Sequence, residues 1–463
     1  MPDFEFVNVD RPGSKKTYST KIRRHVMKDI GKSRRKPKQL HKRPTGNFNT
    51  ETSDGTQDIT GRHKYAAASG LGDGNDSSGL HHVDEERLKM ARYLFTEARK
   101  SYRPFHSPWP ASGLSTTAAW YMAMADAVMI GDPIAGQDKS EFSTSTEAME
   151  SYVSCLTSVA GRLSEPREMV HDGLIIAIVG LVCHDTATGN LSRQDINLQC
   201  LQQLVHNRGG LDEIHNPLLR FIISWHDLSA ASYRNTAPYF KVPQGAITEA
   251  DIGVEWSPSF QKLLDSWNVQ CPNLGDIRSA LRATAVVANY VNQHCHEQNF
   301  WAHDLLAARL LATALDGVLS LEGRALPGDP ADPNFSGTAA REAFRRGLLV
   351  FLASLKVRFG AVAFEPRRHL DDFRLICQIP HVRWTVVPEF NLWAHTVAAL
   401  LEDAGRRGWH VAAIAGIMES MSLSSGLQAL DLVRSIIWIE ALFSDKVEGL
   451  CDEIDSVLAK SLE

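Results

Sequence analysis

Cysteine is absent from the first 154 residues of this 463-residue chain, and the seven cysteines that follow are scattered. No two of them lie closer than 17 positions apart, so the chain has neither a disulfide framework nor paired Cys-x-x-Cys ligands. This spacing excludes a six-cysteine binuclear zinc cluster and a C2H2 finger. It is typical of a protein from a reducing compartment.

Long apolar runs are also lacking. The longest, Leu174 to Cys183, is far shorter than the roughly 20 residues that cross a bilayer. The first residues have no apolar segment of the kind found in a secretory signal peptide. We therefore expect a soluble, intracellular protein with no membrane partner, and a buried helix at 174–183.

Common catalytic motifs are missing as well. The chain has no phosphate-binding glycine loop, no Gly-x-Ser-x-Gly elbow and no His-Glu-x-x-His sequence. His294, Cys295, His296 and His303 raise the possibility of a metal site, but adjacent helical positions point to different faces. A polar helix face is the favoured interpretation of these four residues.

Asp371 and Asp372 resemble the first two aspartates of a metal-binding motif in helical terpene cyclases. Neither Leu375 nor Ile376 supplies the third acid. We interpret the pair as acidic residues favoured near a helix N-terminus. The sequence thus predicts no catalytic residue, no metal ligand and no cofactor.

Charge is divided very unevenly along the chain. Residues 1–43 contain 14 Lys and Arg against 4 Asp and Glu, a net charge of +10. The remaining residues hold 35 Lys and Arg against 50 Asp and Glu, a net charge of −15. Such a split indicates a basic arm with its own anionic partner.

The basic arm, residues 1–43, carries two clusters about ten positions apart, an arrangement that resembles a bipartite nuclear import signal. The same charges would attract nucleic-acid phosphates weakly and without sequence preference. A solvated tail without a receptor is the third interpretation. The residues predicted to contact an import receptor or nucleic acid are Lys21, Arg23, Arg24, Lys32, Arg34, Arg35, Lys36 and Lys38.

Residues 44–83 are rich in Gly, Ser, Thr, Asn and Asp and have almost no large apolar side chains. Such a segment cannot bury enough surface to offset the entropy of ordering, so we predict a disordered linker. Apolar residues then recur at helical spacing from residue 84 to the C-terminus. We predict an all-α domain over 84–463, in which helices pack as antiparallel pairs.

The expected helices are separated by loops rich in glycine and proline. They cover residues 84–101, 114–131, 144–163, 170–186, 192–208, 215–232, 257–269, 277–297, 301–320, 337–358, 369–377, 389–405, 408–421, 426–442 and 446–460.

The clearest pair is a helical hairpin at 170–210. Gly189 ends its first helix, Ser192 caps the second with Asp195 three residues on, and Gly209 and Gly210 end the second. The second helix is expected to have an apolar face formed by Ile196, Leu201, Leu204 and Val205. In the next expected helix, we interpret Trp225 as a core residue and His226 as a residue at the rim of the core.

Three stretches resemble the fungal-specific transcription factor domain family and its relatives. These are Phe-Glu-Phe-Val-Asn-Val (4–9) with the basic run at 22–38, Pro-Phe-His-Ser-Pro-Trp-Pro (104–110), and the hairpin at 171–214. The most recognisable signature residues are Arg208, Gly209, Gly210 and Leu211, followed by Trp225.

The resemblance implies a regulatory helical domain in the nucleus that acts through protein partners, homodimerisation or a small effector. Many members carry a zinc cluster before this domain, and this chain does not, so sequence-specific DNA binding does not carry over. The resulting hypothesis is a non-enzymatic, nuclear transcription-regulator-like protein. Its expected partners are an import receptor, other regulatory proteins and weakly bound nucleic acid. The alternatives are an interaction scaffold without a DNA role and an all-α enzyme.

Overall fold

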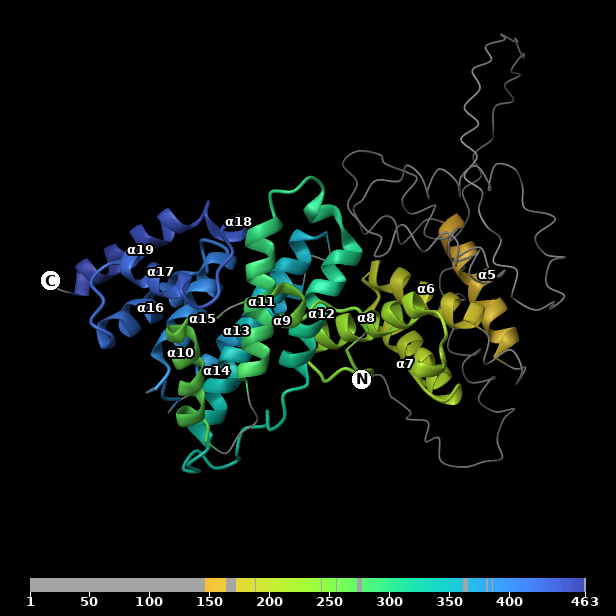
Figure 1. Cartoon of the computed structure of the whole chain (residues 1–463), viewed down its shortest axis with the longest axis horizontal. Coiled ribbons are helices and arrows are strands. Elements are labelled where there is room, and N and C mark those ends of the chain that lie inside the picture. The colour runs from red at the N-terminus through yellow and green to blue at the C-terminus, as the bar shows by residue number, and fades with distance from the viewer. Residues whose placement is uncertain are drawn as a thin grey trace, which may run out of the picture. The chain divides into compact units, whose positions relative to one another are not determined.

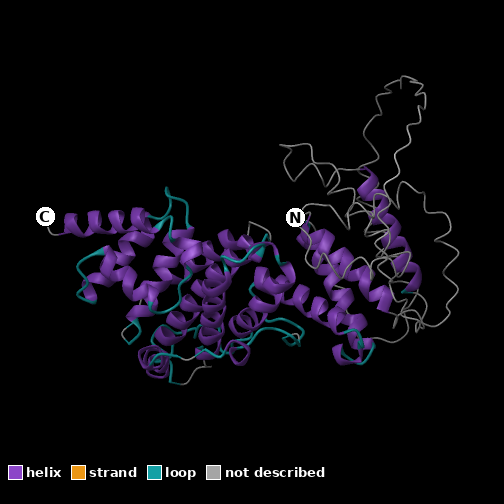
Figure 2. Ribbon diagram, turned by 45° about the horizontal axis from the view of Figure 1, so that its top comes forward, coloured by secondary structure: helices purple, strands orange, loops and turns teal. Residues whose placement is uncertain are grey.

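The structure is a computed structural model that describes residues 146–163, 172–187, 189–242, 244–254, 256–272, 277–360, 365–379, 382–384 and 386–461. Every regular element in these ranges is a helix, and they contain no strand (Figure 2). The predicted all-α class is therefore confirmed. The basic arm, the linker and the helices expected at 84–101 and 114–131 lie outside the described residues.

The first four described helices are α5 (Thr146–Arg162), α6 (Asp172–Ala187), α7 (Leu191–Asn207) and α8 (Pro217–Arg234). Helices α6 and α7 form the predicted hairpin, and α5 and α8 both pack against α6. Figure 1 shows the hairpin beside α8. A short 3-10 turn at Leu211–Glu213 joins α7 to α8.

Two details of the second hairpin helix differ from the prediction. The N-cap of α7 is Asn190, whose side chain accepts a hydrogen bond from the backbone N–H of Arg193, so the predicted Ser192 cap is wrong. Ile196 is 59% exposed and does not belong to the apolar face. The neighbouring polar residues Gln194 and Asn197 are buried instead, and they hydrogen-bond to Thr186 and Asp185 of α6.

The middle of the described region contains α9 (Glu249–Ile252), α10 (Pro258–Gln270), α11 (Arg278–His294), a 3-10 turn at Phe300–Ala302 and α12 (Asp304–Leu319). Helices α11 and α12 pack side by side, α9 and α10 lie against α11, and α12 also contacts α8. The short helix α9 was not predicted, because four residues carry too little periodicity to detect.

Helix α13 (Phe335–Arg358) is the most deeply buried long helix of the described residues, and it contacts α11, α12, α14 and α15. Aromatic rings pack around its middle, where Phe344 lies 5.3 Å from Trp267 and 4.9 Å from Phe390 between ring centroids. Gly347 allows α15 to approach closely, since a Cβ there would lie 3.1 Å from that of Ala394.

The C-terminal helices are α14 (Glu365–Cys377), α15 (Pro388–Leu401), α16 (Gly408–Ser420), α17 (Gly426–Arg434), α18 (Glu440–Phe443) and α19 (Val447–Ser461). Helix α14 packs on α13, and α19 packs on α16 and α17. The helix expected at 426–442 is interrupted at Ser435, so it forms α17 and α18 instead. Across the described ranges, no helix has the length and apolar character needed to cross a membrane.

Candidate functional site

The residues predicted to bind an import receptor or nucleic acid lie outside the described residues. They are Lys21, Arg23, Arg24, Lys32, Arg34, Arg35, Lys36 and Lys38. The structure therefore bears only on the helical body. The residues of the resemblance that it describes lie in and directly after the hairpin of α6 and α7.

The signature residues close the open end of the hairpin. Arg208, at the C-cap of α7, forms an ion pair with Asp172 in the first turn of α6. Gly209 and Gly210 follow with φ angles of 104° and 114°, values that side chains with a Cβ rarely adopt. The chain can therefore turn sharply after α7, and Leu211 packs against the core.

A buried polar cluster joins the two hairpin helices to α5. The carboxylate of Asp185 on α6 is fully buried and accepts hydrogen bonds from Tyr152 at 3.1 Å and from Asn197 at 2.7 Å. Arg193 of α7 pairs with it at 2.9 Å. Burial raises the pKa of Asp185, although the nearby Arg193 charge opposes this shift. Three helices thus converge on one acid.

Helix α8 is attached to the hairpin by three side chains. His226 lies 3.1 Å from the Cys183 sulfur of α6, and Asp227 accepts a hydrogen bond from Gln202 of α7 at 2.9 Å. Arg234 pairs with Asp195 of α7 at 2.7 Å. Trp225 is buried as predicted. His226 is also buried, at 6% exposure, so its predicted place at the rim is wrong, and this burial lowers its pKa to about 4.

The last turn of α8, which contains Arg234, is also attached to helices outside the hairpin. Ser232 donates a hydrogen bond to Glu365 of α14 at 2.5 Å, and the Arg368 guanidinium lies 4.6 Å from the ring centroid of Tyr233. Asn235, the left-handed C-cap of α8, accepts a hydrogen bond from Arg345 of α13 at 2.7 Å. Helix α8 therefore connects the hairpin to α13 and α14.

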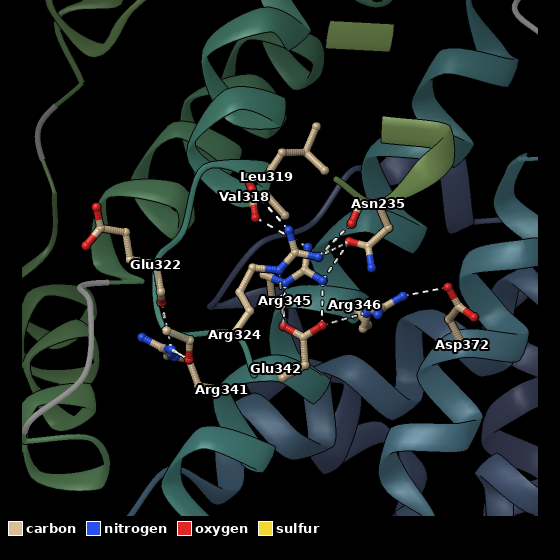
Figure 3. A network of polar contacts seen from close by, with 11 residues as sticks. Asn235, Val318, Leu319, Glu322, Arg324, Arg341, Glu342, Arg345, Arg346 and Asp372 are labelled. Atoms are coloured by element: carbon tan, nitrogen blue, oxygen red, sulfur yellow. Dashed lines mark hydrogen bonds and ion pairs between the residues drawn. The ribbon is translucent and has the colours of Figure 1, made fainter. Parts of the chain in front are cut away.

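The contact at Asn235 belongs to a larger group, which we call the arginine cluster and which comprises Arg324, Arg341, Glu342, Arg345 and Arg346 (Figure 3). Arg345 is fully buried and forms two hydrogen bonds with Glu342, at 2.5 and 2.6 Å. Arg346 bonds to the same carboxylate at 2.8 Å.

The other guanidinium groups of the arginine cluster are held by backbone oxygens. Arg341 donates to the carbonyls of Glu322 and Gly323, and Arg324 donates to the Leu319 carbonyl and to Asn235. The segment after α12 is thereby fixed against α13. These carbonyls lie at a helix end or in a loop, where backbone oxygens lack helical partners.

Electrostatics explain why Glu342 remains charged. Burial alone would raise its pKa, but hydrogen bonds and charge from Arg345 and Arg346 outweigh burial and lower the pKa below its ordinary value. Burial, followed by repulsion from Arg345, lowers the pKa of Arg324 to about 10. Glu342 thus depends on its arginine partners to remain ionised.

A second buried carboxylate, Glu365, lies between Lys356 at 2.5 Å and Ser232. Burial disfavours its charge, yet Lys356 and His369 outweigh burial and hold its pKa at about 2. Glu365 therefore anchors the start of α14 to α13 and α8 at once.

A third polar group links α14, α15 and α16. Glu402, at the end of α15, lies 2.9 Å from Arg367 and 3.2 Å from Arg374. His395 and His410 face each other with their Nδ1 atoms 3.3 Å apart. Burial, with repulsion between the rings, lowers the pKa of His395 to about 3, and burial with the Arg374 charge lowers that of His410 to about 4.

The sequence had suggested two possible metal motifs, and the structure assigns other contacts to both. His294 contacts Glu297 at 2.5 Å, while His303 caps α12 by accepting the Leu306 N–H. Over the described ranges, no three His, Cys, Asp or Glu side chains gather as a metal-binding group.

The interpretation of Asp371 and Asp372 as helix N-terminal acids is wrong, because α14 begins at Glu365 and places them at its middle. Both are engaged in ion pairs instead. Asp372 bonds to Arg346 at 2.5 Å, and Asp371 lies 3.1 Å from Arg406.

Comparison with known proteins adds no further assignment. No family model matches the chain, and neither the curated proteins nor the solved structures contain a significant match.

Sequence reasoning did not identify the arginine cluster, although a signal was present. Arg341 and Arg345 are four residues apart and share a helix face with Leu348 and Leu352, which are fully buried. A charged pair on an apolar stripe indicates buried ionic contacts rather than a solvated face. The partner positions, Asn235 and the 318–323 segment, are too distant in sequence to be inferred.

Replacement of Glu342 by Gln should lower the free energy of unfolding by about 3–5 kcal/mol at pH 7, because Arg345 would be left buried without its carboxylate. Denaturant unfolding of the full chain measures this loss. The matched control is Glu419→Gln at the exposed end of α16, where the expected change is within about 0.5 kcal/mol.

The loss should also depend on pH. The folded protein holds the pKa of Glu342 below its ordinary value, so the charged carboxylate stabilises the fold when the pH is above the ordinary carboxyl pKa. This contribution to the free energy of unfolding declines as the pH falls toward the lowered pKa. Equal stability of Glu342→Gln and the unmodified chain at pH 7 would contradict the assigned role.

Proposed function

We propose that this protein is a nuclear, transcription-regulator-like protein whose helical body is a regulatory interaction domain. The observation that carries the proposal is the charge split, +10 over residues 1–43 against −15 over the rest. A basic arm of this kind supplies nuclear import and weak attraction to nucleic-acid phosphates. The acidic body does not share that attraction, so the two parts have separate tasks.

The family-like hairpin supports the proposed role of the body. Its signature residues Arg208 to Leu211 close the hairpin against Asp172, and α8 links it to the C-terminal helices. A partner that binds the hairpin can therefore alter the contacts that α8 makes with α13 and α14, and a partner that binds those helices can alter the hairpin. Coupling of this sort requires two arrangements of a shared element, and α8 is the candidate for that element.

A reporter fusion tests the import claim. Residues 1–43 joined to a fluorescent protein should concentrate in the nucleus, because the two basic clusters match the spacing of a bipartite signal. The control fusion carries Gln at Arg23, Arg24, Arg34, Arg35 and Lys36. It should distribute evenly. An unmodified arm that leaves the reporter evenly distributed would refute the import claim.

An interaction scaffold without a DNA role is the second candidate, and one observation favours it. Residues 1–154 contain no cysteine, so they cannot form a zinc cluster that reads DNA sequence. Regulation would then depend on partners or on the arm's phosphate contacts.

Genome-wide occupancy of the full-length protein separates the two candidates. The regulator proposal predicts enrichment at discrete regions, reduced when the five arm positions above are replaced by Gln. Occupancy equal to background, with nuclear location retained, would contradict the regulator proposal and favour the scaffold.

A further inference from the structure

A cleft of about 450 Å³ opens among α9, α10, α11 and α12. Its volume lies within the range of sites that hold small organic molecules. One face of α11 supplies half of the lining. The α11 residues are Arg278, Ser279, Arg282, Ala283 and Val286, and the other elements contribute Ile247, Thr248, Glu249, Gln261 and Thr313.

Arg282 is the lining residue whose contacts are incomplete. One of its terminal nitrogens donates to the Gln261 side chain, but its Nε is buried and has no hydrogen-bond partner within the described ranges. No carboxylate of these ranges lies within 4.0 Å of it, whereas Arg278 pairs with Asp265. Arg282 itself is only half-buried, so its unpaired guanidinium charge is available to an anionic ligand, and charge-assisted hydrogen bonds are among the stronger ones in proteins.

The other polar groups of the cleft are already engaged. The Thr313 hydroxyl donates to the Ile247 carbonyl, and the Thr248 hydroxyl donates to Asp251. Glu249 accepts a hydrogen bond from the Trp256 indole, which draws its carboxylate toward that ring. Arg278 and Arg282 are therefore the cations of the lining, and of these two Arg282 has no carboxylate partner within the described ranges.

The remaining wall of the cleft is aliphatic, formed by Ile247, Ala283 and Val286. An inorganic anion such as phosphate would leave this wall in contact with water. The start of α11 also favours negative charge, because its first backbone N–H groups point out of the helix.

We propose that this cleft binds a small organic carboxylate, with its anionic end on Arg282 and its apolar body against Ile247, Ala283 and Val286. The site does not depend on the proposed nuclear role, since it is defined by the helical body alone. The cleft is lined in part by α12, and α12 also contacts α8. A bound ligand would therefore lie one helix away from the connection between the hairpin and α13.

Calorimetric titration of the full-length protein tests the proposal with three probes: 2-naphthoate, its neutral analogue 2-naphthamide, and inorganic phosphate. Naphthoate should bind saturably, and the amide at least about tenfold more weakly, because a charged hydrogen bond is lost. Phosphate should bind more weakly than naphthoate, because it cannot use the aliphatic wall.

Two variants locate the site, and one serves as a control. Arg282→Met keeps the aliphatic stem and should weaken naphthoate binding about tenfold or more. Ala283→Met narrows the cleft without removing Arg282, and it should also weaken naphthoate binding. Arg383→Met removes an exposed arginine outside the cleft and should leave binding unchanged.

Circular dichroism of each variant establishes that it is folded before titration. The proposal is overturned if naphthoate does not bind at millimolar concentrations, if naphthamide binds equally well, or if neither cleft variant weakens binding. Phosphate binding as tight as that of naphthoate would overturn the assignment of an organic ligand. None of these outcomes bears on nuclear import, which the arm fusion tests separately.

Discussion

The pairing of charges inside the helical body is the constraint on which the rest of the structure depends. Glu342 and Glu365 are nearly or fully buried, and each is held ionised by cations of α13. An ionised carboxylate removed from water without such a partner would cost several kcal/mol. Helices α8, α12 and α14 must therefore keep their places around α13, because they supply the other contacts of these groups.

Helix α8 links the helices that pair these buried charges to the hairpin of α6 and α7. It is attached to α6 and α7 through His226, Asp227 and Arg234, and to α13 and α14 through Ser232 and Asn235, so its last turn contacts both groups of helices. The same helix therefore serves two groups of contacts that lie far apart in the sequence. The proposed regulatory role depends on such a connection, because binding of a partner on one side of α8 would have to change the contacts on its other side.

Much of this fold was accessible from the sequence, because helical periodicity, glycine stops and proline starts are local signals. The hairpin is an example, with its turn at Gly189 and its end at Gly209 and Gly210. Long-range polar contacts were not accessible. Asn235 and Arg345 are 110 residues apart, and nothing in the local pattern pairs them. The cleft at Arg282 was missed for the same reason, since four separate elements line it.

The wrong expectations have a common physical cause. Ser192, Ile196 and the Asp371-Asp372 pair were assigned by local rules for caps, apolar faces and helix ends. At Ser192 another local cap, Asn190, took the position, whereas tertiary contacts decided the other two cases, as when Arg346 and Arg406 engaged the two aspartates. Buried polar groups override local preference because leaving them unpaired is more costly than losing a cap.

Hydrogen exchange of the Glu365→Gln variant tests most directly whether α8 couples the hairpin to the C-terminal helices. The substitution leaves Lys356 without its carboxylate and replaces the charged acceptor of the Ser232 hydroxyl with a neutral amide. The account predicts faster amide exchange in α8 and in α6 and α7, as well as in α13 and α14, with α19 unchanged as the internal reference. Faster exchange confined to α13 and α14 would contradict it.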